Sequence, residues 1–196
     1  MSQLVDPAVS RAKFERELRN LRRRDTSYAR RGWLLLKAEF PHIEIGFLAM
    51  NTQPSMIVAA VRFDFTDYDL HPLSVRFIDH RTGAALPREG LQFWMNRPAN
   101  GLPGDAAKAM AAQGIQFPVQ DMIQGYPGQP AFLCLPGVRE YHGHVSHSGD
   151  PWELHRASGE GSMLQIAEKI WQFGSNPMTQ ISMQVAMVAQ PGLAIQ

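Results

Sequence analysis

Apolar residues recur at intervals of three or four positions near the start of the chain. They lie among arginines and glutamates after Asp6-Pro7, at Val9, Phe14, Leu18 and Leu21. This spacing places them on one face of a helix and predicts an amphipathic helix over Ala8 to Arg24. A similar apolar pattern predicts a helix from Met163 to Phe173, with Ser162 as its amino-terminal cap.

Between these helices, four segments are rich in aliphatic, β-branched and aromatic residues. They are Trp33 to Phe40, Ile43 to Met50, Met56 to Phe65 and Leu73 to Ile78. Prolines and turn residues separate the segments, so the pattern predicts four short strands joined by tight connections. A helix followed by such a meander is typical of an α+β domain with an antiparallel sheet.

The pattern weakens from His80 to Pro130, where glycine and proline recur. This composition predicts a loop-rich insertion, within which only Asp105 to Gln113 resembles a short helix. The end of the chain is rich in Met, Gln, Ala and Val. We expect a single domain over residues 1–176, with residues 177–196 as an apolar tail or a final strand.

The composition is that of a globular protein. The chain has 196 residues and a mass of 22.0 kDa, with 44% hydrophobic and 19% charged residues, which is enough to bury a core in one domain. A single cysteine cannot form an internal disulfide. Neither a secretory leader nor an apolar run of spanning length is evident. These features predict a soluble cytoplasmic protein without a membrane partner.

The formal net charge of +1 conceals a basic amino end. Residues 1–31 hold nine of the nineteen Lys and Arg residues and only four acids. A basic helix can bind an acidic protein, a membrane surface or nucleic acid phosphates. Most such helices simply present a solvated face, and the chain has no motif that supports nucleic acid binding.

The densest candidate chemistry follows a predicted strand, Phe132 to Leu135. The only cysteine lies within thirteen residues of a glutamate and three histidines, and these candidate metal ligands are Cys134, Glu140, His142, His144 and His147. Thiolate, imidazole and carboxylate are the usual ligands of zinc. If residues 139–145 are extended, alternation places Glu140, His142 and His144 on one side. The Pro136-Gly137 turn then allows the cysteine to join them.

Other interpretations of the same residues stay open. His147 and His155 are replacement ligands or donors that orient a ligand through the other ring nitrogen. Cys134 is alternatively a nucleophile with His142 or His144 as its base. Each residue can also have a purely structural role, since free cysteines are usually buried and histidines usually form local hydrogen bonds. A hydrolase with a metal-activated water lacks the support of an HExxH motif.

Short motifs, together with the order of the predicted elements, suggest a family. Tyr68-Asp-Leu-His71-Pro72 leads into Val75-Arg-Phe77, and Cys134-Leu135, Trp152 and a helix come later. This order resembles the ubiquitin-conjugating enzyme fold. The resemblance implies that Cys134 accepts the carboxyl terminus of a ubiquitin-like protein as a thioester. Two features depart from that family: its His-Pro-Asn segment is absent, and the connection from Phe77 to Cys134 is long.

The cysteine region also resembles a metal-binding family of bacterial ubiquitin-like conjugation clusters that is named for Cys, Glu, His and His. The matching residues are Cys134, Glu140, His142, and His144 or His147. The implied function is a conjugating-enzyme-like component with a zinc site. Its implied partners are a ubiquitin-like modifier and an activating-enzyme-like protein, which docks on the basic first helix. The alternatives are an active cysteine transferase and a non-enzymatic interaction module that uses that helix.

Overall fold

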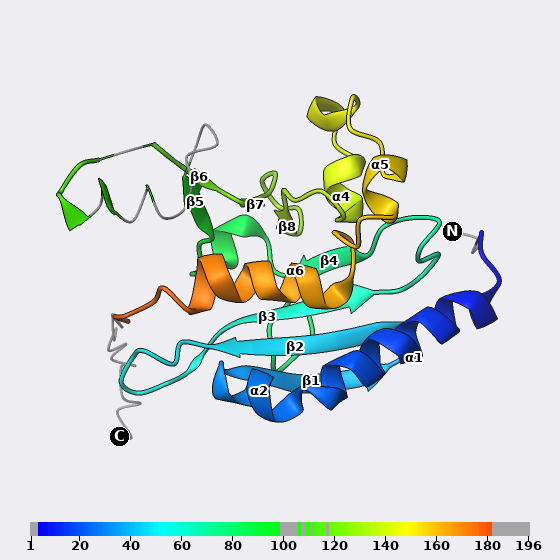
Figure 1. Cartoon of the computed structure of the whole chain (residues 1–196), viewed down its shortest axis with the longest axis horizontal. Coiled ribbons are helices and arrows are strands. Elements are labelled where there is room, and N and C mark those ends of the chain that lie inside the picture. Colours follow the sequence, from blue (N-terminus) through cyan, green and yellow to red (C-terminus); the bar gives the residue numbers. More distant parts are fainter. Residues whose placement is uncertain (1–3, 99–105, 107–108, 111, 117, 182–196) are drawn as a thin grey trace, which may run out of the picture.

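A computed structural model describes residues 4–98, 106, 109–110, 112–116 and 118–181. Its main feature is a six-stranded antiparallel sheet in the order β1-β2-β3-β4-β8-β7 (Figure 1). The strands are β1 Trp33–Glu39, β2 His42–Leu48, β3 Ile57–Asp64, β4 Ser74–Phe77, β7 Ile123–Gln124 and β8 Phe132–Leu133. A separate two-stranded sheet pairs β5 Asn96–Pro98 with β6 Val119–Asp121.

The main helices come before and after the sheet strands in the chain. The amino-terminal pair is α1 Pro7–Arg23 and α2 Asp25–Arg30, and the carboxy-terminal helix is α6 Met163–Ile170, which continues as the π-helical turn η3 Trp171–Ser175. Short helical turns occur after β4 along the chain. The turn η1 Arg88–Gly90 precedes β5, and the turns between β8 and α6 are α4 Arg139–His142, η2 Val145–His147 and α5 Glu153–Arg156. Within the described ranges, no helix is long and apolar enough to span a membrane.

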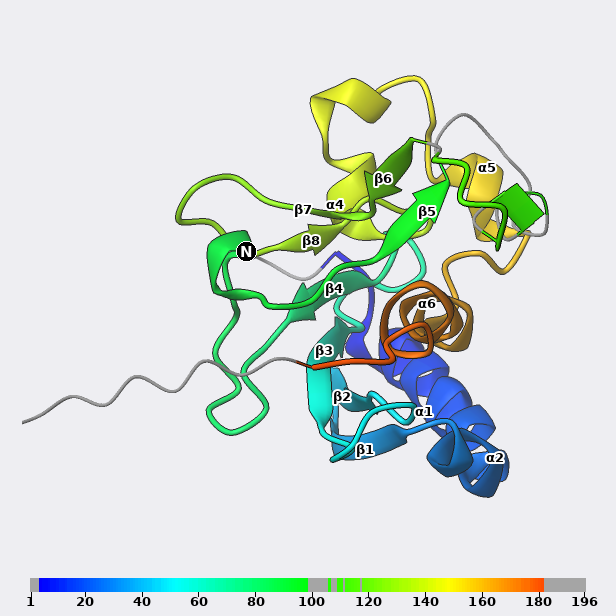
Figure 2. The same ribbon diagram turned by 90° about the vertical axis from the view of Figure 1, so that its left-hand side faces the viewer.

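The core lies between the sheet and the long helices. Figure 2 shows α1, α2 and α6 on the same side of strands β1 to β4. From α1, the ring of Phe14 packs edge-on against Phe65 with centroids 5.4 Å apart. From α6, Ile166 and Ile170 are buried against the sheet, in which Phe47 is fully buried. Removing this apolar surface from water is the main force that holds α6, and the segment that leads into it, on the sheet.

Local sequence explains where the helices begin. The carboxylate of Asp6 accepts a hydrogen bond from the Ala8 amide at 2.8 Å, and Pro7 occupies the first turn, where its missing N–H is no loss. The hydroxyl of Ser162 accepts from the Gln165 amide at 3.4 Å. The predicted α+β class, the first helix, the four strands and the last helix are therefore confirmed in the described residues.

Several finer expectations differ from the structure. Residues 80–130 are predicted as a loop-rich insertion, and the structure adds the 3₁₀ turn η1 and the short strands β5, β6 and β7, whose main-chain pairing apolar periodicity does not reveal. The expected extended conformation over residues 139–145 is wrong, because α4 and η2 occupy this segment. Of the predicted helix over Asp105 to Gln113, the structure describes residues 106, 109–110 and 112–113, and residues 106, 109, 110 and 112 are helical. Most of the predicted tail, residues 177–196, lies outside the described residues.

A close approach of two glycines determines the path of the chain after β8. Gly137 has φ +88°, and a Cβ there would lie 2.7 Å from both the Cα and the amide nitrogen of Gly161. A Cβ on Gly161 would in turn collide with the ring of Trp152. Because neither glycine has space for a side chain, the turn after Cys134 packs directly on the backbone that leads into α6.

Replacing Gly137 by alanine is expected to destabilise the fold by at least about 2 kcal/mol, since it adds a backbone clash to an unfavourable positive φ. Gly128→Ala is the matched control. Gly128 has φ +71° but no atom within 4 Å of a built Cβ, so its cost is the conformational part alone, about 1 kcal/mol. Chemical denaturation of both variants measures the difference, and equal losses would contradict the packing argument.

Candidate functional site

Cys134 lies immediately after β8, at the edge of the core. Its amide donates to the Met122 carbonyl at 2.8 Å, which extends the strand pairing past β8. The residue is 3% exposed and its thiol is free. Burial raises the pKa of the Cys134 thiol, and the positive charge of Arg97 partly opposes that effect. The resting group is therefore a neutral thiol rather than a thiolate.

His147 is the histidine that meets this thiol. Its Nε2 lies 3.4 Å from the Cys134 sulfur. On the other side, the imidazole stacks on the ring of Tyr141, with centroids 3.9 Å apart and an interplanar angle of 21°. Burial, followed by the nearby His144, lowers the pKa of His147 below its usual 6.5. At neutral pH the imidazole is uncharged, and in the tautomer that carries its proton on Nδ1 the Nε2 atom can accept a proton from the thiol.

His142 has both ring nitrogens engaged in the main chain. Its Nε2 accepts a hydrogen bond from the Gly137 amide at 3.1 Å, and its Nδ1 lies 2.8 Å from the Asp150 carbonyl oxygen. A carbonyl can only accept, so Nδ1 carries the proton and Nε2 is the acceptor. His142 thus joins the turn after Cys134 to the loop before α5, and neither nitrogen is free to bind a metal or a substrate.

His144 points to a different neighbour. Its Nδ1 accepts from the Ser146 amide at 3.2 Å, and its Nε2 lies 2.6 Å from the hydroxyl of Tyr126. Together with Phe132, these two rings border an open pocket of about 300 Å³. His144 therefore belongs to the β7–β8 side of the site rather than to the thiol.

Glu140 faces the central sheet. Its carboxylate accepts hydrogen bonds from the Ser74 hydroxyl and from the Val75 amide, the latter at 3.2 Å, and it forms an ion pair with Arg76 at 3.1 Å. These contacts fasten α4 to β4. Because α4 is helical, side chains two positions apart point in different directions, and Glu140 and His142 do not share a face.

The structure separates the residues that were predicted to bind zinc together. In the described ranges, no three side chains of the His, Cys, Asp and Glu types are grouped so that they could hold a metal ion. A structural zinc site needs four ligands within about 2.0–2.3 Å of the metal. Cys134 meets His147 alone, whereas Glu140, His142 and His144 have other partners. The residues present therefore do not fit a zinc site.

His155 occupies an acidic environment near this pair. Its Nε2 lies 2.6 Å from Asp150 and its Nδ1 lies 2.5 Å from Glu160. Both carboxylates raise the pKa of His155, with Asp150 as the larger cause. The second carboxylate oxygen of Asp150 accepts from the Tyr141 hydroxyl at 2.7 Å, and His155 and Tyr141 lower the pKa of Asp150.

Tyr141 and Asp150 were missed by sequence reasoning. Tyr141 contacts both His147 and Asp150, and Asp150 in turn contacts His155. Their only sequence signal was proximity to the histidines, since neither residue type at these spacings forms a known motif.

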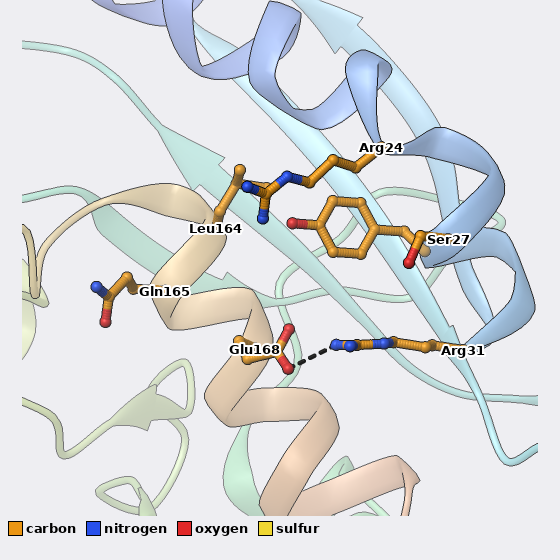
Figure 3. A pocket seen from close by; sticks show the side chains of 7 residues that line it. Arg24, Ser27, Arg31, Leu164, Gln165 and Glu168 are labelled. Atoms are coloured by element: carbon orange, nitrogen blue, oxygen red, sulfur yellow. Dashed lines mark hydrogen bonds and ion pairs between the residues drawn. The ribbon is translucent and has the colours of Figure 1, made fainter.

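Two further hollows flank α6. One of about 220 Å³ is next to the cysteine strand, lined by Arg97, Leu135, Pro136, Glu160, Gln165, Ile166 and Lys169. The other, about 310 Å³, lies between α2 and α6 (Figure 3). There Arg31 forms an ion pair with Glu168 at 2.6 Å and stacks over Trp171. Part of the amino-terminal positive charge is therefore neutralised within the fold.

Comparison with known proteins gives two matches of wide coverage. A family model described as Y4jH-like matches residues 5–178. The chain is also 42% identical over 191 residues to the "Uncharacterized protein y4jH" of Sinorhizobium fredii (strain NBRC 101917 / NGR234), with 94% of this chain and 92% of that protein covered. Both matches include the whole of the site described above, and neither description states an activity.

Metal analysis tests the disagreement over zinc. We expect protein purified without a metal-affinity tag to contain far less than about one zinc per chain, because the five candidate ligands do not converge. Elemental mass spectrometry of the wild type, Cys134→Ala and His142→Ala measures this. A stoichiometric zinc that disappears in both variants would show that the ligands rearrange to bind it.

The His155 contacts predict a pH-dependent contribution to stability. The folded-state pKa of His155 is raised, so its contribution is present below its usual pKa of about 6.5 and is lost as pH rises through the folded value. The lowered pKa of Asp150 means that its contribution is lost only in acid. His155→Gln should therefore reduce Tm more at about pH 5.5 than at about pH 9, by on the order of 2 °C. Equal losses at both pH values in thermal melts would refute a charged His155.

Proposed function

This chain belongs to the Y4jH-like family, and we propose that it is a conjugating-enzyme-like protein whose Cys134 accepts an acyl group as a thioester, with His147 as the base. The observation that carries the proposal is the 3.4 Å contact between the cysteine sulfur and Nε2 of His147. The acyl donor would be the activated carboxyl terminus of a ubiquitin-like modifier.

The arrangement of elements supports this choice of scaffold. A helix precedes an antiparallel meander of four strands, β1 to β4, and the cysteine follows a later strand, β8, on the same sheet. The carboxy-terminal helix α6 then packs across that sheet (Figure 1). This order supports a conjugating-enzyme-like scaffold as part of the proposal. The fold alone does not define a function, so the proposal depends on the chemistry of the site.

The charge states of the pair favour general-base catalysis. A raised thiol pKa and a lowered imidazole pKa disfavour a preformed thiolate–imidazolium pair. As the sulfur attacks the donor carbonyl, its proton would pass to Nε2 of His147. Collapse of the tetrahedral intermediate would then expel the donor's thiolate, which takes up that proton from the His147 imidazolium. The products are a thioester on Cys134, a free thiol and a neutral His147.

The basic amino end would supply a docking surface for an activating-enzyme-like partner. Arginines gather at the end of α1 and on α2, at Arg22, Arg23, Arg24, Arg30 and Arg31. Such a cluster steers the approach of an acidic partner more than it adds to affinity. The partner and the modifier both stay proposals.

Capture of a model thioester tests the proposal. The probe is a short peptide that ends in two glycines and is activated as the thioester of 2-mercaptoethanesulfonate. We expect the intact mass of the wild type to increase by one acyl group, which hydroxylamine removes. His147→Gln should slow capture at about pH 7 by about 100-fold, the lower range for a lost general base.

Two variants make the result specific. Cys134→Ala should form no adduct. His80→Gln is the matched control, because this exposed histidine lies in the loop after β4 and has no described contact with Cys134 or His147, and it should react like the wild type. If folded wild-type protein forms no hydroxylamine-sensitive adduct, Cys134 is a structural cysteine and the proposal is wrong.

A further inference from the structure

A chain of side-chain hydrogen bonds lies next to the proposed nucleophile and base. The Tyr141 hydroxyl donates to Asp150 at 2.7 Å, Asp150 contacts His155 at 2.6 Å, and His155 contacts Glu160 at 2.5 Å. The side chain of His155 is 17% exposed. These bonds connect α4, the loop after η2, α5 and the segment before α6. The chain of bonds therefore joins positions 141 to 160, the segment that also carries His147.

His147 contacts this chain in two ways. Its ring stacks on Tyr141, and its carbonyl accepts a hydrogen bond from the Asp150 amide at 3.0 Å. In the part of the chain that the structure describes, no hydrogen bond orients the Nδ1 of His147. Most catalytic histidines are oriented by an acceptor at that nitrogen. Here the ring of Tyr141 stacks on the imidazole, whose Nε2 contacts the Cys134 sulfur.

We infer that Tyr141, Asp150 and His155 are positioning residues that hold His147 against Cys134. This inference rests on the proposed function, since it concerns the same nucleophile and base. Tyr141 would set the plane of the imidazole, Asp150 would fix the hydroxyl of Tyr141, and the charged ring of His155 would fix Asp150. A displacement of about 1 Å in a reacting group can cost on the order of 100-fold in rate, so such support has a measurable effect.

The dependence of the capture rate on pH reflects the titratable groups that face His147. They are Cys134, Tyr141, His142, His144 and Asp150. The three positioning residues Tyr141, Asp150 and His155 are called the relay below. With the relay intact, peptide thioester capture should rise as pH increases through the lowered pKa of His147, and level off once that ring is neutral. A second rise, from direct ionisation of the thiol, should follow at alkaline pH.

The test compares pH–rate profiles of capture, with the same peptide thioester as the probe. Tyr141→Phe keeps the stacked ring but loses the bond to Asp150. We expect it to slow capture at about pH 7 by about tenfold and to weaken the rise assigned to His147, with an unchanged alkaline rise. Tyr126→Phe is the matched control, since it removes the hydroxyl that contacts His144 instead, and its profile should be that of the wild type.

A double variant shows whether Tyr141 acts through His147. If it does, Tyr141→Phe should add no further loss to His147→Gln, because the base is already absent. Independent, additive losses would overturn the relay. Asp150→Asn provides the second variant, checked for folding by circular dichroism, and a wild-type profile in it and in Tyr141→Phe would also overturn the relay.

The outcomes distinguish the relay from the proposed function. If His147→Gln removes the lower rise while folded Tyr141→Phe and Asp150→Asn retain it, only the relay is wrong. If His147→Gln itself leaves the rate and the profile unchanged, His147 is not the base. The proposed mechanism and the relay are then both wrong.

Discussion

The contact between Gly137 and Gly161 is the constraint on which the site depends. It brings the turn after Cys134 into direct contact with the backbone that enters α6. The buried face of α6 holds that backbone on the sheet. The Gly137 amide then donates to His142, so the same turn also directs α4. Core packing is thereby transmitted to the polar segment that carries His147. The polar segment is therefore held in place without extensive apolar contacts of its own.

The same fold places two histidines in opposite charge states. His147 lies between a thiol and an aromatic ring, and loss of hydration favours its neutral form. His155 lies between two carboxylates and favours its charged form. One histidine is therefore suited to accept a proton and the other to hold an anion in place. Their different environments give His147 and His155 these different roles, although the two residues are only eight positions apart in the sequence.

Apolar patterning predicts the four-strand meander, the cysteine strand and the two longest helices, but not β7, α2 or the conformation of the site. In the first helix and in β4, burial repeats with the period of the element, whereas β2 is buried along most of its length. The segment around Glu140 has few apolar residues, so its conformation depends on distant partners. Contacts with Ser74, Val75 and Arg76 at the sheet favour a helical turn there. These contacts join residues more than 60 positions apart, which no local pattern can show.

The predicted zinc site and the predicted nucleophile make incompatible demands on one sulfur. A zinc-bound thiolate needs several ligands that converge, and it is a poor nucleophile once bound. A nucleophile needs one base and space for a carbonyl. The main-chain bonds of His142 remove it from either role, and Glu140 is held by the sheet. Of the five candidates, only Cys134 and His147 are left facing each other, and a pair of that kind supports proton transfer rather than metal coordination.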